Sequence, residues 1–233
     1  MEFFIHNMHF IFWVLYRKSL NTIFVSLGII YSMKIIIESL KQNLQKYTKD
    51  LDEVTLISNE IVRCYEGRAY HNLQHLNSIY KELIAIKPMI ENWEAIFYAI
   101  CYHDIVYDID KFDNELQSAI IAKERLSKLK IPHHTIERSY SHILATQKHQ
   151  KSGDSDTNLF IDADLSILAS DKYQEYLNGI RKEYAKYSDI EFEVGRRKVV
   201  EYFLSQDRIY HSDYFYDRYE ERARENLRSE LLV

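Results

Sequence analysis

WEAIFYAICYHDIVYD, residues 93–108, combines a helical apolar pattern with a neighbouring pair of side chains that can carry charge, His103 and Asp104. Its apolar residues recur at helical intervals and share one face: Trp93, Ile96, Phe97, Ile100 and Cys101. His103 and Asp104 follow Ile100 by three and four residues, so both are predicted to face the core. An ionised aspartate is costly there unless it is paired or bound to a cation. The stretch therefore predicts a buried helix whose polar end needs partners from elsewhere in the chain.

The composition favours helices throughout. The 233 residues include only 5 glycines and 2 prolines, and 46% are hydrophobic, so tight turns are few and a sizeable core can form. A helix is predicted from Asn114 to about Lys130, because the residue before Pro132 avoids the helical conformation. No linker rich in proline, glycine or serine interrupts residues 34–233. We therefore expect one all-α domain over residues 34–233.

The stretch KSGDSDTN, residues 151–158, is the clearest polar loop. After it we expect a helix that begins between Asp162 and Asp164. Asp164 lies three residues from both Ile161 and Ile167, so it is predicted to face inward, while Asp162 lies half a turn away and is the weaker candidate. The alternative is an acidic helix start that is stabilised by the helix dipole.

Residues 1–33 form an apolar N-terminal extension that Arg17 and Lys18 divide into two runs. Each run is shorter than the roughly 20 residues that span a bilayer. Two interpretations stay open: a segment that associates with a membrane, or a dispensable extension before the globular domain.

Charge and cysteine content narrow the function classes. A net charge of −5 without a dense basic run argues against nucleic-acid binding. Cys64 and Cys101 lie beside apolar residues in helical patterns, which fits a reducing, cytoplasmic setting. The sequence does not predict the oligomeric state.

RAYHNLQH, residues 68–75, places His71 one helical turn before His75, beside an apolar stripe. A single histidine of this kind is usually an ordinary hydrogen-bonded residue, so the prediction depends on the combination of motifs. Nitrogen and oxygen ligands from three separate helices suit a divalent ion such as Mn, Fe, Mg or Zn. We therefore predict one divalent metal site with four ligands: His75, His103, Asp104 and Asp164.

The order of these motifs resembles the HD superfamily of metal-dependent phosphohydrolases, whose signature is a His, a later His-Asp pair and a distal Asp. The resemblance covers roughly Ile35 to Leu232. It is closest to an uncharacterised, predicted phosphohydrolase branch in these segments: YHNLQHL, YHDIVYD, DNELQSA, FIDADLSIL, IRKEY and ERARENL. It implies an HD-domain helical bundle that hydrolyses a phosphate ester of a nucleotide or a small phosphorylated metabolite. A metal-activated water would attack the phosphorus.

Two groups within the superfamily imply individual roles. Cyclic-nucleotide phosphodiesterases are similar in YHNLQH and DLS, which implies His71 as the proton donor to the leaving oxygen, with His75 and Asp164 as ligands. The (p)ppGpp hydrolases are similar in HDIVYD, where they carry a Glu-Asp pair. Here Tyr107 replaces the Glu and only Asp108 matches, which argues against alarmone hydrolysis. Asp108 or Asp164 is expected to accept the proton of the attacking water.

Further side chains are candidates for the substrate pocket. Arg68, near the first histidine, can bind a phosphate through two hydrogen bonds, although a surface salt bridge is the alternative. His142, Thr146 and His149 share one helix stripe that could line the pocket or supply a second metal site, and His149 is the better candidate. We predict Arg68 and His149 as substrate-binding residues. Three charged residues also recur in the family-like segments, with the alternative that they only pin helices together: Arg181, Glu183 and Arg196.

The alternative function is a non-catalytic HD-fold module that binds a nucleotide or serves regulation, with or without attachment to a membrane. The presence of all four ligand types favours the enzyme. We therefore expect a small-molecule phosphate ester as the partner of this chain, and membrane contact only through residues 1–33.

Overall fold

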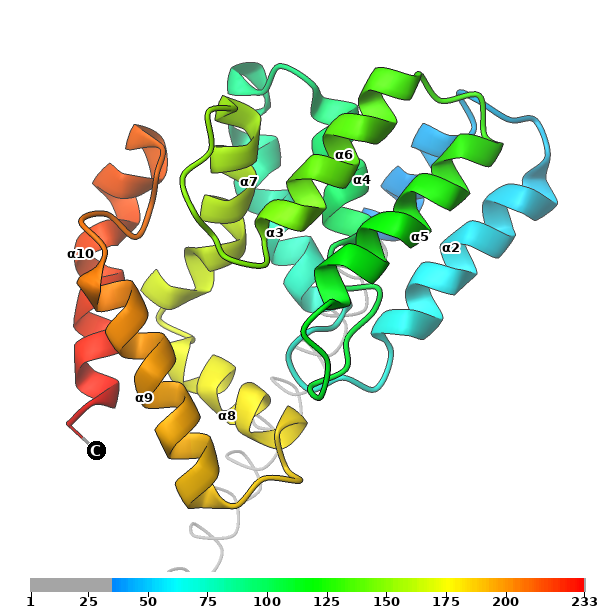
Figure 1. Cartoon of the computed structure of the whole chain (residues 1–233). Helices are drawn as coiled ribbons and strands as arrows, with labels where there is room; N and C mark the ends of the chain where they lie inside the picture. Colours follow the sequence, from blue (N-terminus) through cyan, green and yellow to red (C-terminus); the bar gives the residue numbers. More distant parts are fainter. Residues whose placement is uncertain (1–34, 233) are drawn as a thin grey trace, which may run out of the picture.

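The computed structural model describes residues 35–232, so the predictions for residues 1–33 lie outside the described part. Every regular element in residues 35–232 is a helix, which confirms the all-α prediction (Figure 1). The α-helices are residues 35–44, α2 (Leu51–Tyr65), α3 (Leu73–Ala85), α4 (Trp93–Tyr102), α5 (Asn114–Lys128), α6 (His133–Ala145), α7 (Ser155–Asp164), α8 (Tyr173–Glu183), α9 (Asp189–Ser205) and α10 (Asp213–Glu230). Two 3-10 helices are η1 (Lys87–Met89) and η2 (Leu165–Ala169). In the described residues, no helix is both long and apolar enough to cross a bilayer.

Helix α4 is the centre of the core. All residues from 95 to 102 are buried, and the helix packs against α3, α5, α6 and α7. The Asn92 side chain caps its start by accepting a hydrogen bond from the Ala95 backbone N–H at 3.0 Å. A helix that is apolar on every side must be enclosed by others. The predicted helix is therefore confirmed, and His103 and Asp104 follow directly after its last residue.

The start of α7 differs from the prediction. The sequence predicts a loop over residues 151–158, but α7 begins inside that stretch and ends at Asp164. The Asp154 carboxylate caps the helix by accepting from two backbone N–H groups. Asp156 is fully buried and accepts from Arg138 Nη2 at 2.9 Å. Polar residues whose sequence is typical of a loop are thus buried by contacts with distant residues. The prediction that a helix begins at the two aspartates of DADL was wrong, because both lie in the last turn of α7.

Helices α8, α9 and α10 form a second group, set off from α2–α6 in Figure 1. Helix α10 packs against η2 and α9. Arg196 of α9 makes two hydrogen bonds to the Glu230 carboxylate of α10, at 2.9 and 3.0 Å, and donates to the Tyr176 hydroxyl of α8 at 3.2 Å. Arg181 bonds to Asp189 and to backbone carbonyls of the turn between α8 and α9. Both arginines hold this helix group together.

The two groups meet at the ends of three helices. Helix α7 contacts α3 and α4, and η2, which continues directly from α7, contacts α8 and α10. The C-terminal ends of α4 and α7 and the first turn of α3 carry the residues of the predicted site.

Candidate metal centre

The four side chains predicted as metal ligands converge. The Nε2 atoms of His75, in the first turn of α3, and His103, after α4, lie 3.2 Å apart. Asp164 Oδ1 is 3.1 Å from His75 Nε2, and Asp104 Oδ2 is 3.0 Å from His103 Nε2. The two remaining imidazole–carboxylate distances are 3.7 and 3.8 Å. Segments that are distant in sequence therefore bring both imidazoles and the Asp164 carboxylate to one point, and the Asp104 carboxylate lies beside His103.

These spacings fit a shared cation. Nitrogen or oxygen ligands at about 2.1 Å from one ion lie roughly 3.0 to 3.4 Å apart at octahedral or tetrahedral angles. The three shortest contacts fall within that range, and the ligand atoms of His75, His103 and Asp164 all lie within 4.8 Å of one another. Mixed imidazole and carboxylate donors are typical of Mn, Fe and Zn sites. The residues present could hold a divalent ion.

His103 is oriented for this role by the backbone. Its ring is buried, and its Nδ1 lies 3.1 Å from the Ile100 carbonyl oxygen, which can only accept a hydrogen bond. Nδ1 therefore carries a proton, and the Nε2 lone pair of the neutral ring points into the cluster. Hydrogen bonding of the second ring nitrogen is how proteins commonly fix a metal-binding histidine.

The cluster attracts positive charge. Burial lowers the pKa of His103, but the charges of Asp104 and Asp164 outweigh it and raise that pKa to about 9. Burial also raises the pKa of each carboxyl, yet the neighbouring imidazoles hold both pKa values below their usual range. The pKa of His75 is lowered, chiefly by burial. Two ionised carboxylates in this cluster need a compensating positive charge, which either protonated imidazoles or a bound cation can supply.

The distal carboxylate comes from Asp164. Asp162 is buried elsewhere and accepts three hydrogen bonds, from His211 N at 2.8 Å, Ser212 N at 2.7 Å and Ser212 Oγ at 2.6 Å. Ser212 is the N-cap residue of α10, so Asp162 anchors the start of that helix. The geometry therefore distinguishes two aspartates that the sequence left close in rank.

His71 lies beside the cluster and has its own partner. The ring centroids of His71 and His75 are 5.7 Å apart, and His71 Nδ1 is 2.7 Å from Glu183 Oε2. Glu183 Oε1 accepts from the backbone N–H groups of Tyr70 at 2.7 Å and His71 at 3.0 Å. A carboxylate at this distance fixes Nδ1 as the proton-bearing atom, which leaves Nε2 available for chemistry.

The contact between Glu183 and His71 is one that the sequence reasoning did not predict. Burial raises the pKa of Glu183, but the hydrogen bond from His71 and the two backbone N–H groups outweigh burial and lower the pKa to about 2. A role for Glu183 only in pinning helices together would not predict this contact with His71, the candidate proton donor. The available signal was the place of Glu183 in IRKEY, one of the segments on which the resemblance to the superfamily depends.

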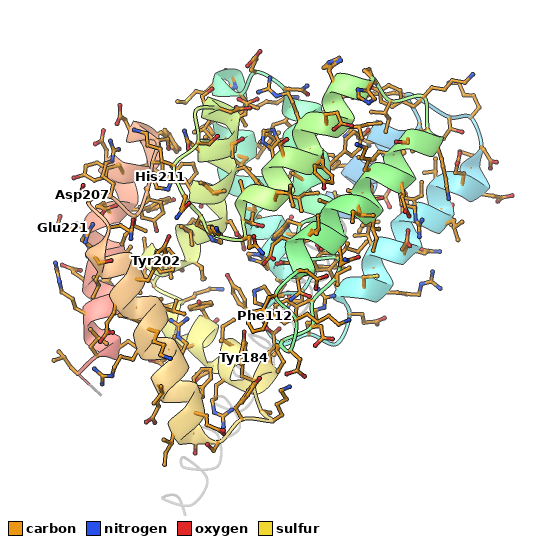
Figure 2. All side chains as sticks on the ribbon, viewed as in Figure 1. Phe112, Tyr184, Tyr202, Asp207, His211 and Glu221 are labelled. Carbon is orange, nitrogen blue, oxygen red and sulfur yellow. The ribbon has the colours of Figure 1, made fainter. Side chains whose placement is uncertain are left out.

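His149 touches the cluster from the connection between α6 and α7. Its Nε2 is 2.8 Å from Asp164 Oδ2, so Asp164 has one oxygen near His75 and the other near His149. The backbone of His149 is left-handed, with φ +48°. His211, labelled in Figure 2 on the segment that leads into α10, donates from Nε2 to the His149 carbonyl at 2.8 Å. This contact supports the unusual conformation.

The other two residues of the predicted stripe lie elsewhere. His142 is fully buried with Nδ1 2.9 Å from Thr157 Oγ1, and burial lowers its pKa to about 4. The Thr146 hydroxyl donates to the Ile143 carbonyl at 2.7 Å. Of the three, the structure brings only His149 to the candidate metal centre.

The side chains of Arg68 and Asp108 hydrogen-bond to backbone groups near the site. The Arg68 guanidinium donates to the carbonyls of Asp104 and Ile105, and it lies over the rings of Tyr65 and Tyr107. Asp108 accepts from the Asp110 backbone N–H at 3.0 Å, and its side chain is 42% exposed. Neither hydrogen-bonds to a side chain of the cluster in the described part of the chain. Their predicted substrate and base roles stay predictions.

A cleft of about 590 Å³ borders the cluster on the side of α3. His75 and Asp164 contribute to its wall, so it reaches two of the candidate ligands. Its other walls combine aromatic, polar and charged side chains, among them Tyr70, Tyr176, Ser78, Ser166, Lys81 and Lys172. A cleft of this volume has room for a small-molecule ligand.

Comparisons with known proteins give no relative: no family model, no curated protein and no solved structure matches this chain. Any functional conclusion depends on the sequence motifs and on the geometry of the site.

Proposed function

We propose that this chain is a metal-dependent phosphohydrolase with an HD-domain helical bundle, acting on a phosphate ester of a nucleotide or a small phosphorylated metabolite. One observation carries the proposal. Two imidazoles and two carboxylates converge with contacts of 3.0 to 3.8 Å, and a further histidine held by a carboxylate lies beside them. This combination supplies both a cation site and a separate proton donor.

A divalent ion, when bound, would neutralise charge on a phosphoryl oxygen and acidify a water for in-line attack. His75, His103, Asp104 and Asp164 would hold it. We assign acceptance of the water's proton to Asp164 in preference to Asp108, because the Asp164 carboxylate lies in the cluster while Asp108 is bonded in its own turn.

His71 is assigned to protonate the departing oxygen. Its Nδ1 is engaged by Glu183, so the proton is delivered from Nε2. A carboxylate behind an imidazole keeps the ring in one orientation during this transfer. The proton acceptor and the proton donor are thus different residues, as an in-line displacement with opposite entry and exit directions requires.

The test combines metal analysis of the purified chain with a panel of aryl phosphates and nucleotides in added Mn²⁺. His103→Ala and Asp104→Asn are expected to lose bound metal and turnover together. His71→Ala should keep the metal and lose about 10² to 10⁴ in rate on the nucleotides, whose alkoxide leaving groups need a proton, since this is the usual contribution of a general acid. His133→Ala is the control, since that histidine has an 85% exposed side chain.

Two results would contradict the proposal. Metal retained in His103→Ala and Asp104→Asn would show that these residues are not ligands. Bound metal without turnover of any phosphate ester would favour the alternative, a non-catalytic nucleotide-binding or regulatory module.

A further inference from the structure

Helix α8 approaches the segment before α3 at a glycine. A methyl group on Gly179 would lie 3.0 Å from Tyr70 Cβ and 3.4 Å from the Ala69 carbonyl oxygen. Carbon atoms in ordinary contact are about 3.5 to 4.0 Å apart. Tyr70 Cβ is attached directly to the backbone, so it cannot rotate away as the end of a long side chain can. Only glycine at position 179 allows this approach without a backbone shift.

The same face of α8 holds His71. Gly179 and Glu183 are four residues apart and therefore lie one above the other on the helix. Glu183 makes its three hydrogen bonds to Tyr70 and His71, the residues next to the close contact. The close approach and the hydrogen bonds act on the same two or three residues.

The Tyr70 ring lies between α8 and the histidines of the cluster. Its ring centroid is 4.7 Å from that of Tyr176 on α8, 4.9 Å from that of His71 and 5.0 Å from that of His75. The segment is therefore enclosed between α8 on one side and the histidines on the other. A push from α8 on Tyr70 therefore bears on His71, which follows it directly in the chain and contacts its ring.

We infer that Gly179 is a positioning residue, whose missing side chain sets the distance between α8 and residues 69–71 and so the length of the Glu183–His71 hydrogen bond. The inference rests on the proposed function, in which His71 is the proton donor. To relieve the contact with a methyl group on Gly179, Tyr70 Cβ and α8 must move apart by a few tenths of an ångström. The bond from His71 Nδ1 to Glu183 is 2.7 Å long, so such a shift lengthens it towards the usual limit of about 3.2 Å and weakens it.

The chain offers a matched control. Gly195 also lies inside a helix, α9, but an added methyl group there meets nothing within 4 Å. Both Gly→Ala substitutions raise helix propensity equally. A difference between them reports the contact with Tyr70 and not the change in propensity.

The experiment measures hydrolysis by the metal-loaded full chain with two leaving groups. 4-Nitrophenolate leaves without protonation, whereas an alkoxide needs a proton from His71. Gly179→Ala is expected to keep its metal and stay within about twofold of the wild type on 4-nitrophenyl phosphate. On an alkyl phosphate its kcat should fall by about three- to tenfold, with little change in KM. Gly195→Ala should match the wild type on both substrates.

A spectroscopic readout separates this inference from the proposed function. The His71 Nδ1 proton is deshielded by its hydrogen bond to Glu183, and its NMR resonance should move upfield in Gly179→Ala but not in Gly195→Ala. A chain that hydrolyses no phosphate ester would overturn the proposed function, while the resonance would still decide whether Gly179 sets the bond. An unchanged resonance, or an equal loss of rate with both leaving groups, overturns the inference.

A second background keeps the test decisive if Gly179→Ala alone does not fold. Tyr70→Gly removes the Cβ atom that the new methyl group would meet. In that background, adding Gly179→Ala should leave the ratio of alkyl to aryl hydrolysis unchanged, because the contact is gone. An undiminished effect there would show that Gly179 acts through another neighbour and would overturn the inference.

Discussion

Replacing Glu183 by glutamine tests how His71 is held. The Glu183 carboxylate accepts from Tyr70 N at 2.7 Å, from His71 N at 3.0 Å and from His71 Nδ1 at 2.7 Å. A glutamine oxygen can still accept from the two backbone N–H groups. Its NH₂ group would then face the Nδ1–H of the protonated His71 ring, donor against donor. The substitution therefore removes the bond to the imidazole and leaves the backbone contacts in place.

The size of the effect follows from that single bond. A hydrogen bond to a charged group contributes about 1.5 to 3 kcal/mol. If it is needed to aim the His71 proton in the transition state, its loss lowers kcat by about 10- to 100-fold, since about 1.4 kcal/mol corresponds to a factor of ten. Metal content should not change, because the four candidate ligands keep their own contacts.

The assay is steady-state hydrolysis of an alkyl phosphate by the wild type, Glu183→Gln, His71→Ala and the double variant, with bound metal measured for each. Glu183 acts only through His71 in this account, so the double variant should be no slower than His71→Ala. Glu193→Gln, at an exposed position of α9, is the control. Loss of metal in Glu183→Gln, or a rate loss that adds to that of His71→Ala, would refute the reasoning.

Three further predictions concern stability. Asp162→Ala should lower the free energy of unfolding by about 2 to 4 kcal/mol in a urea titration, since it leaves N–H groups of His211 and Ser212 unpaired. This variant should keep the metal, whereas Asp164→Ala should lose it. The reverse pattern of metal loss would exchange the roles of the two aspartates. Mn²⁺ at 100 times its Kd should add about 2.7 kcal/mol, reversed by a chelator, and an unchanged Tm would argue against the centre. The pKa of Glu183 falls from its usual 4.5 to about 2, so its contribution is complete above about pH 4.5 and lost as pH falls towards 2. Allowing for solvent screening this is about 1 to 2 kcal/mol, and urea titrations of Glu183→Gln should lack that acid-dependent loss.

Much of the candidate centre could be predicted because its residues sit at fixed intervals from apolar neighbours. His103 and Asp104 follow the buried stripe of α4, and His75 opens the helix that packs beside it. Helical periodicity places such side chains on an inner face before any tertiary contact is known. Two histidines and two aspartates that face inward need polar or charged partners, and in the structure they are partners of one another.

Other features depend on contacts between distant residues. Glu183 lies 112 residues after His71, and nothing in the periodicity of α8 tells which partner its carboxylate meets. The start of α7 was mistaken because Asp156 is polar, yet the fold buries it against Arg138 and two backbone N–H groups. Local patterns cannot show that a polar residue has found partners elsewhere in the chain.

The position of His103 at the C-terminal end of α4 has a consequence for redesign. The last carbonyl groups of a helix carry together roughly half a negative charge, and this belongs to the backbone. It does not change with pH and survives any side-chain substitution that leaves α4 intact. An engineer who exchanges the carboxylates for softer ligands, to favour a different metal, would therefore keep part of the field that draws cations to this point.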